Sequence, residues 1–201
     1  MRIAVIGAPG SGKTTFSARL YAELLERGLN STRLVTEYAQ EWLGQDKEID
    51  FVGQKNITKY QNEREEYTES CGFSPIVCDS AIWLGAVYRE YWLENNSNSR
   101  RYSDNDMEYM ITTMKHINKY DMTFYVPMWT KCSELVELSE FRIHDNSESS
   151  VIDKKILRCL QKHKINYHKV PQELSDREQF IKMFVELFLQ KKGELFVYTG
   201  R

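Results

Sequence analysis

The sequence lacks any long uninterrupted run of apolar residues. Its first apolar run, residues 3–6, is shorter than the core of a secretory signal peptide, and nowhere do enough apolar residues follow one another to span a bilayer. We therefore expect a soluble, cytoplasmic protein with no membrane partner. At 201 residues, the chain has the size of a single domain with a core of its own.

An excess of charge of one sign is also missing. The 27 lysines and arginines are balanced by 29 aspartates and glutamates, which leaves a net charge of −2 at pH 7. Proteins that grip long stretches of duplex usually need a basic field or a concentrated basic stripe. The nearest approach to one, Arg100 with Arg101, stands among Asn, Ser and Asp residues and is typical of a solvated loop. A nucleic-acid partner is therefore not favoured.

Closely spaced cysteines are missing as well. The four cysteines form no C-x-x-C pair, so they match neither a zinc site nor a small disulfide framework. This spacing agrees with a cytoplasmic location. We expect reduced thiols at Cys71, Cys78, Cys132 and Cys159.

What is present is an alternation of two hydrophobic patterns. Short apolar runs predict five strands, at residues 3–6, 32–35, 76–78, 122–126 and 165–170. Apolar residues at helical spacing predict six helices, at residues 14–27, 57–67, 82–92, 107–117, 152–160 and 180–189. Strands that alternate with helices indicate a parallel sheet covered on both faces. With right-handed crossovers this is a doubly wound, three-layer α/β fold.

A glycine-rich motif lies between the first strand and the first helix. It matches G-x-x-x-x-G-K-[ST], the P-loop, which binds phosphates only in this strand–loop–helix context. Its glycines let backbone N–H groups surround an anion, and the helix N-terminus adds a partial positive charge. We expect Lys13 to reach the β- and γ-phosphates of ATP or GTP, and the Thr14 hydroxyl to ligate Mg²⁺. The predicted phosphate-binding residues are Gly7, Ala8, Pro9, Gly10, Ser11, Gly12, Lys13, Thr14 and Thr15.

Two carboxylates follow predicted strands, at the edge where open parallel sheets bind their ligands. Asp79 closes the third strand, which is the position of a Mg²⁺ ligand; alternatively, it caps a helix that begins at Ser80. Glu37 follows the second strand on the side of the acceptor. It can take the proton of an attacking hydroxyl, or it is a surface acid near a helix start.

Three further residues near Glu37 could form an acceptor pocket. The rings of Tyr38 and Trp42 can stack on a flat base, and the amide of Gln61 can read the edge of that base. Core packing is the alternative for Trp42. For Gln61 the alternative is a solvated helix face.

Two loops remain between the predicted elements, at residues 94–106 and 128–150. The second is long for a compact domain, and such loops tend to be lids or disordered segments. It carries Arg142, which a closing lid could bring to the phosphoryl group to neutralise developing charge. The alternative is an arginine that is only solvated.

With these motifs placed, the chain resembles the small P-loop kinase-like domains typified by the bacterial ribosylnicotinamide kinase domain, which has bacteriophage relatives. The resemblance implies an ATP- and Mg²⁺-dependent phosphotransferase acting on a nucleoside-like hydroxyl. It also implies a P-loop NTPase sheet with strand order 2-3-1-4-5. The residues that carry it are Gly7–Thr15, Thr36–Trp42, Cys78-Asp79-Ser80, Lys119-Tyr120-Asp121 and Arg142.

Three functions therefore compete. The first is a kinase for a small nucleoside or nucleotide. The second is a kinase for a hydroxyl or modified base in DNA, which would need only a local basic patch. The third is a regulatory P-loop NTPase, which would usually carry sensor elements or a partner domain. A closed pocket between Lys13 and Glu37 would favour the first, and an open basic groove would favour the second.

Overall fold

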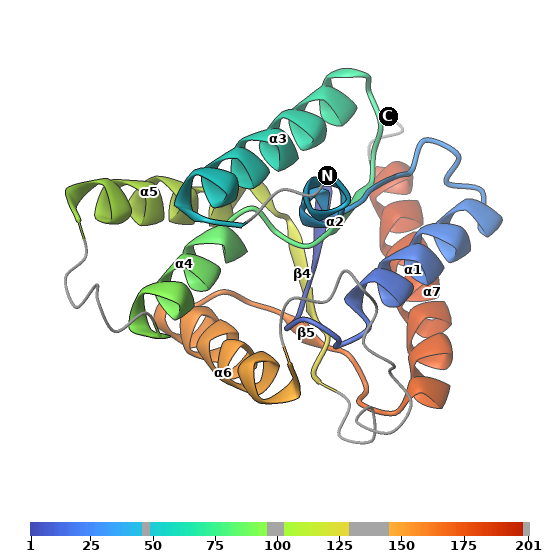
Figure 1. Ribbon diagram of the computed structural model, residues 1–201. Coiled ribbons are helices and arrows are strands. Elements are labelled where there is room, and N and C mark those ends of the chain that lie inside the picture. The colour runs from blue at the N-terminus through green and yellow to red at the C-terminus, as the bar shows by residue number, and fades with distance from the viewer. Residues whose placement is uncertain (46–48, 96–102, 129–144, 199–201) are drawn as a thin grey trace.

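The computed structural model describes residues 1–45, 49–95, 103–128 and 145–198, with side chains up to residue 191. Strands and helices alternate along the chain, as the sequence predicts (Figure 1). The five strands form one parallel sheet in the order β2-β3-β1-β4-β5, which confirms the predicted fold. Their bounds are β1 (Arg2–Ile6), β2 (Arg33–Val35), β3 (Ile76–Asp79), β4 (Met122–Tyr125) and β5 (His168–Lys169).

Helices occupy the connections between the strands. In the described part of the chain, none of them is both long and apolar enough to cross a membrane. Their bounds are α1 (Lys13–Glu26), α2 (Tyr38–Leu43), α3 (Phe51–Ser70), α4 (Leu84–Asn95), α5 (Asp104–Met114), the 3-10 helix η1 (Lys115–Lys119), α6 (Asn146–Lys162) and α7 (Leu174–Tyr198).

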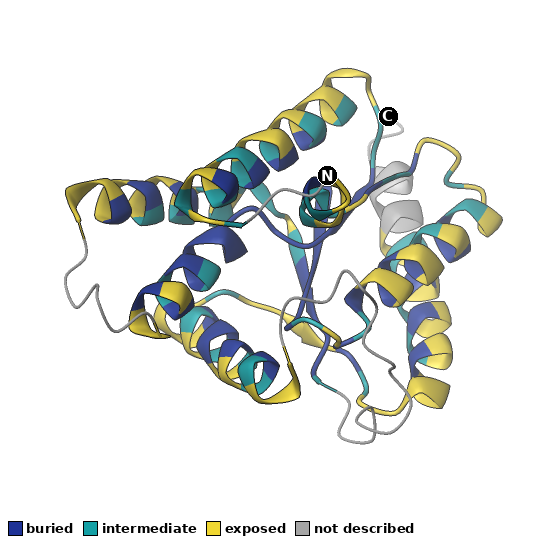
Figure 2. Ribbon diagram, in the orientation of Figure 1, coloured by how far each residue is buried: buried dark blue, intermediate teal, exposed yellow. Residues whose placement is uncertain are grey.

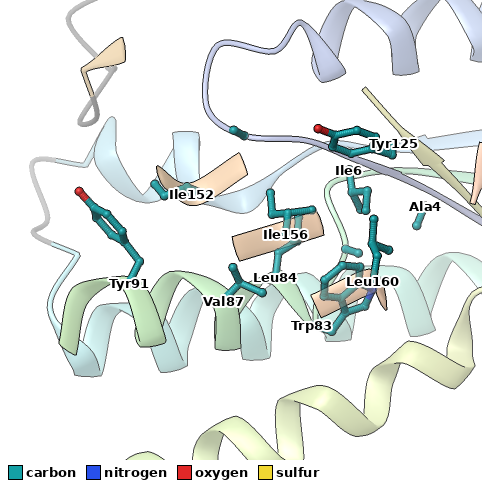
Figure 3. Close-up of a cluster of buried hydrophobic side chains, with 12 residues drawn as sticks. Ala4, Ile6, Trp83, Leu84, Val87, Tyr91, Tyr125, Ile152, Ile156 and Leu160 are labelled. Carbon is teal, nitrogen blue, oxygen red and sulfur yellow. The ribbon is translucent and has the colours of Figure 1, made fainter. Parts of the chain in front are cut away.

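The alternation of side chains along β1 divides the core into two halves. Ile3 and Val5 face one side and pack with buried residues of α1 and α7. Ala4 and Ile6 face the other side and pack with α4 and α6, as the close-up of this cluster shows (Figure 3). Every residue of β1 and β3 is buried, whereas the helices expose their outer faces (Figure 2). The ends of both central strands are therefore held rigidly from two sides.

The structure corrects the sequence prediction at β5. Residues 165–170 were predicted as the strand, but only His168–Lys169 pair with β4. The N–H of Ile165 instead donates to the carbonyl of Leu160 at the end of α6. The first part of the predicted strand therefore closes the preceding helix.

Two helices also differ from their predictions. Helix α3 begins before residue 57 because the side chain of Asp50 caps its first turn, accepting from Gly53 N at 2.7 Å. Helix α5 begins at Asp104, three residues before its predicted start at residue 107, and leaves 45% of Met107 exposed. Its buried residues are instead Asp106, Tyr109 and Thr113. The short helix α2, which follows Glu37, was not predicted.

Candidate active site

The predicted phosphate-binding loop connects the end of β1 to the start of α1. Gly10 and Gly12 adopt positive φ angles of 78° and 83°, which favour glycine. A Cβ on Gly7 would lie 2.5 Å from both the Ser11 Oγ and the Val126 carbonyl oxygen, so a larger residue cannot stand there. The loop thus has the close backbone approach that the motif predicts.

Two kinds of hydrogen-bond donor in this loop, backbone N–H groups and a hydroxyl, lack an acceptor and fit a phosphate chain. No side chain caps α1, whose N-cap residue is Gly12, so its first N–H groups face outward without a capping acceptor. The hydroxyl of Ser11 is buried and has no hydrogen-bond partner among the described residues. Buried polar groups are nearly always paired, and phosphate oxygens would supply the missing acceptors.

Lys13 and Glu37 form an ion pair, with Nζ 3.2 Å from Oε2. Their side chains are 9% and 15% exposed. Burial by itself lowers the pKa of Lys13, but the carboxylates of Glu37 and Asp79 outweigh it, so that the pKa is raised. Lys13 therefore remains a cation. The two residues on which the sequence centres the proposed pocket are therefore in direct contact.

Asp79 ends β3 beside the same lysine and is 2% exposed. Its Oδ1 accepts from the Ser17 hydroxyl at 3.4 Å. Burial raises the pKa of Asp79, although Lys13 and a hydrogen bond with Thr14 act in the opposite direction. The next helix begins only at Leu84, so Asp79 is not the helix cap that was its alternative role.

The pairing of Asp79 with Thr14 fits the Mg²⁺ site of P-loop proteins, in which phosphate oxygens and water complete the coordination. The described residues contain no group of three or more His, Cys, Asp or Glu side chains that could hold a metal ion. A site of the P-loop kind does not need such a group. The next residue, Ser80, has a φ of 83°, a conformation that non-glycine residues rarely adopt and that marks strain at the end of β3.

A cavity of about 760 Å³ opens beside Lys13 and Glu37. It lies between the phosphate-binding loop and helices α2, α3 and α4. This volume suits a small-molecule ligand. The polar side chains on its wall include Gln54, Thr58, Gln61, Tyr88 and Arg89.

The three predicted acceptor residues end in different places. Gln61 lies on the cavity wall, where its Oε1 accepts from the backbone N–H of Tyr38 at 2.9 Å. Tyr38 and Trp42 are not among the lining residues. The ring of Tyr38 packs against Tyr60, and the Arg64 guanidinium lies 4.6 Å from its centre. Trp42 is buried in the core, which is the alternative role that the sequence allowed.

Two wall residues were missed in the sequence. Burial raises the pKa of Tyr88 to about 12, so its phenol keeps a proton that it can donate to a ligand. Arg89 is buried between the rings of Phe51 and Trp92, and its Nη2 lies 2.7 Å from Asp106 Oδ1. A capping box from Ser103 to Asp106 could have indicated a helix start there, but nothing in the sequence pairs it with Arg89.

A third missed residue, Arg177, braces the phosphate-binding loop from α7. Its Nη1 donates to the carbonyl of Ser11 at 3.0 Å, and its Nε donates to the carbonyl of Pro171 at 3.0 Å. A further bond, of 3.4 Å, reaches the Pro127 carbonyl beyond β4. A Cβ on Gly12 would lie 2.9 Å from the Arg177 Nη1. No local pattern reveals this contact, because it joins the two ends of the chain.

Arg142, predicted to act from a lid, lies outside the described residues, as does most of the 128–150 segment. Its role stays a prediction. The described site therefore consists of the phosphate-binding loop, Glu37, Asp79 and the adjoining cavity.

These features define a P-loop nucleotide-binding protein with a nucleotide-kinase fold. A family model described as an AAA domain matches residues 2–177, so the chain belongs to that family. A comparison with curated proteins found no match.

Solved structures of nucleoside and nucleotide kinases share the fold. Deoxyadenosine kinase from M. mycoides with bound dATP is 15% identical, with a TM-score of 0.65, over 92% of this chain and 100% of that one. Thymidylate kinase from Ehrlichia chaffeensis is 17% identical, with a TM-score of 0.60, over 94% of this chain and 98% of that one. At these identities the likeness shows the fold alone.

Proposed function

We propose that the protein is an ATP- and Mg²⁺-dependent kinase that phosphorylates the hydroxyl of a nucleoside-like acceptor bound in the cavity. The observation that carries this proposal is the position of Glu37. Its carboxylate lies on the cavity wall and, at the same time, 3.2 Å from Lys13 in the phosphate-binding loop. An acceptor hydroxyl in the cavity would thus meet both a base and the γ-phosphate.

The residues divide the reaction between them. The acceptor oxygen attacks the γ-phosphorus, its proton passes to Glu37, and the bond from the γ-phosphorus to the bridging oxygen breaks to release ADP. Lys13 neutralises charge on the phosphates as this bond breaks. Thr14 and Asp79 would hold Mg²⁺, which when bound supplies further charge neutralisation at the phosphate oxygens.

The charge of the cavity wall favours an acceptor without a phosphate. Of the described residues on the wall, only Lys13 and Arg89 are cations, and each is already paired with a carboxylate. The acids on the wall are engaged as well: Glu37 pairs with Lys13, Glu41 pairs with Arg64, and Asp50 caps α3. A nucleoside monophosphate would bring a dianion to this wall, where each described cation already has a carboxylate partner. We therefore propose a nucleoside, neutral or cationic, as the acceptor.

The other two functions find less support. A polynucleotide kinase needs a basic groove for the phosphates of its substrate, and this wall is not basic. A switch NTPase needs no acceptor cavity beside its phosphate-binding loop.

The test is a phosphotransfer assay with ATP, Mg²⁺ and matched pairs of acceptors, each a nucleoside and its 5′-monophosphate. Thermal shift with each compound measures binding independently, because a ligand of the native state raises the apparent stability. We expect a nucleoside to bind and to be phosphorylated. Turnover of monophosphates alone would refute the proposed acceptor class, and stimulation by single-stranded DNA alone would favour the second function.

A further inference from the structure

A buried carboxylate that the proposed reaction does not use lies beneath the site. Glu65 is in the middle of α3, and none of its surface is exposed. A buried carboxylate is costly unless donors surround it. Glu65 accepts hydrogen bonds from Gln61, Tyr120 and Arg2, over distances of 3.4, 3.1 and 3.4 Å. The thiol of Cys78 is a fourth donor.

One of these donors, Gln61, connects Glu65 to the loop that carries Glu37. The amide nitrogen of Gln61 donates to Glu65 Oε1, and the amide oxygen of Gln61 accepts from the backbone N–H of Tyr38. Tyr38 directly follows Glu37, which is the N-cap residue of α2 and has no side-chain cap bond of its own. This connection therefore holds the backbone next to Glu37, whose side chain pairs with Lys13.

The other side of the network reaches the loop that carries Asp79. The Tyr120 hydroxyl donates to Glu65 Oε1 and accepts from the backbone N–H of Ile82 at 2.8 Å. Ile82 belongs to the cavity wall in the turn after Asp79 and Ser80. This turn contains the left-handed Ser80, a conformation that persists only where the surroundings hold it.

We propose that Glu65 is the positioning residue of the site: through Gln61 and Tyr120, its carboxylate holds the Glu37 loop and the Asp79 loop in a fixed relation to each other. This rests on the function proposed above for those two acids. Both connections end on the same oxygen, Oε1. The base and the Mg²⁺ ligand are thus positioned from one point.

The ionisation of Glu65 should make the activity depend on pH. Burial raises the pKa of Glu65 to about 7, although Tyr120, Arg2, Gln61 and Cys78 all lower it. All four neighbours are donors, so a protonated Glu65 loses an acceptor position and the network loosens. Activity of the wild type should therefore fall on the acid side of about pH 7.

The stability effect has the opposite sign. The folded pKa lies above the ordinary glutamate value of 4.5, so the folded protein retains this proton where the unfolded chain has lost it. The contribution of Glu65 to stability is full below about 4.5 and is lost as the pH rises towards about 7. The ionised form that positions the loops is therefore the less stable one.

Two conservative substitutions test the two connections separately. Tyr120→Phe should raise the Mg²⁺ concentration needed for half-maximal binding of a fluorescent ATP analogue, by roughly tenfold to a hundredfold. Gln61→Met should lower kcat for the acceptor by a similar factor and leave that Mg²⁺ requirement unchanged. Amide exchange followed by NMR should quicken at Ile82 in the first variant and at Tyr38 in the second.

Tyr125→Phe is the matched control. It also removes a hydroxyl that donates to a partly buried carboxylate, that of Asp153 on α6 at 2.8 Å, which is not among the hydrogen-bond partners of Glu65. It should cost stability without changing the Mg²⁺ requirement or kcat. The isosteric Glu65→Gln, which cannot ionise, should lose the activity change near pH 7.

The proposal is overturned if Tyr120→Phe behaves like Tyr125→Phe in every functional measurement, or if the change near pH 7 persists in Glu65→Gln. Failure of the kinase assignment would look different, since the wild type itself would phosphorylate no acceptor. The Mg²⁺ requirement for nucleotide binding and the two amide exchange rates would still report on the network in that case.

Discussion

Lys13 and Glu37 form an ion pair in which Nζ lies 3.2 Å from Oε2. The cation assigned to the phosphates and the proposed base therefore neutralise one another before a nucleotide binds. Both side chains are largely buried, and neither is left as an unpaired charge in the core. Phosphate oxygens that reach Lys13 would compete for its ammonium. Glu37 would then be released towards the acceptor, which couples nucleotide binding to the availability of the base.

The first prediction concerns the ammonium group itself. Lys13→Ala should reduce NTP turnover roughly a hundredfold or more, because no other described cation in the cavity wall can replace it at the phosphates. Circular dichroism should show an intact fold, since Lys13 is the first residue of α1 and alanine is favourable in a helix. Near-parental phosphotransfer by a folded Lys13→Ala protein would contradict the assignment of the loop.

The second prediction separates function from stability at Asp79. Burial raises its pKa, so the ionised carboxylate is held at a cost: stability from this group is present at acid pH and is lost as the pH rises through the folded pKa. Asp79→Asn should therefore keep or increase resistance to urea at pH 7. It should nevertheless lose Mg²⁺-dependent activity.

Urea denaturation and a Mg²⁺ titration of activity check the Asp79 prediction together. Asp153→Asn is a useful comparison, because burial also raises the pKa of Asp153 but this residue lies away from the site, bound to Tyr125. Stability lost by Asp79→Asn with catalysis preserved would show that Asp79 is structural.

The third prediction concerns Arg177 behind the phosphate-binding loop. Arg177→Met leaves the buried carbonyl of Ser11 and the partly buried carbonyl of Pro171 without this donor, which should cost about 2–4 kcal/mol of unfolding free energy. Nucleotide affinity should fall too, because the loop loses its brace. Lys182→Ala on the same helix breaks only an exposed pair with Glu178 and should change neither quantity. Unchanged nucleotide affinity in Arg177→Met would remove Arg177 from the site.

Local signals in the sequence predicted the fold and the position of the phosphate-binding site well. The buried run of β1, the glycine motif and the strand ends at Glu37 and Asp79 are all encoded by neighbouring residues, and the parallel sheet brings them together. Contacts between distant segments could not be predicted in this way. Arg177 and Ser11 illustrate this, as does the bond between Tyr120 and Glu65.

In the acceptor pocket, too, local sequence was not enough to identify the residues of the wall. Tyr38 and Trp42 were chosen because their rings stand near Glu37 in the sequence, but α2 turns them towards Tyr60 and the core. The rings that line the cavity come from Tyr88, Tyr91 and Trp92 on α4. Their place in the cavity wall follows from the tertiary packing of α4, which the local sequence does not show.

The central claim is that Glu37 serves an acceptor hydroxyl and not merely the nucleotide. The most direct measurement is therefore made on Glu37→Gln, with acceptor phosphorylation, ATP hydrolysis and ATP affinity recorded on the same protein. Phosphorylation should fall by roughly 10²–10⁴-fold because the proton acceptor is gone. ATP affinity should be unchanged or somewhat tighter, because Lys13 no longer has a competing partner. The account is contradicted if Glu37→Gln hydrolyses ATP at the parental rate while no nucleoside or polynucleotide accepts phosphate from the parent.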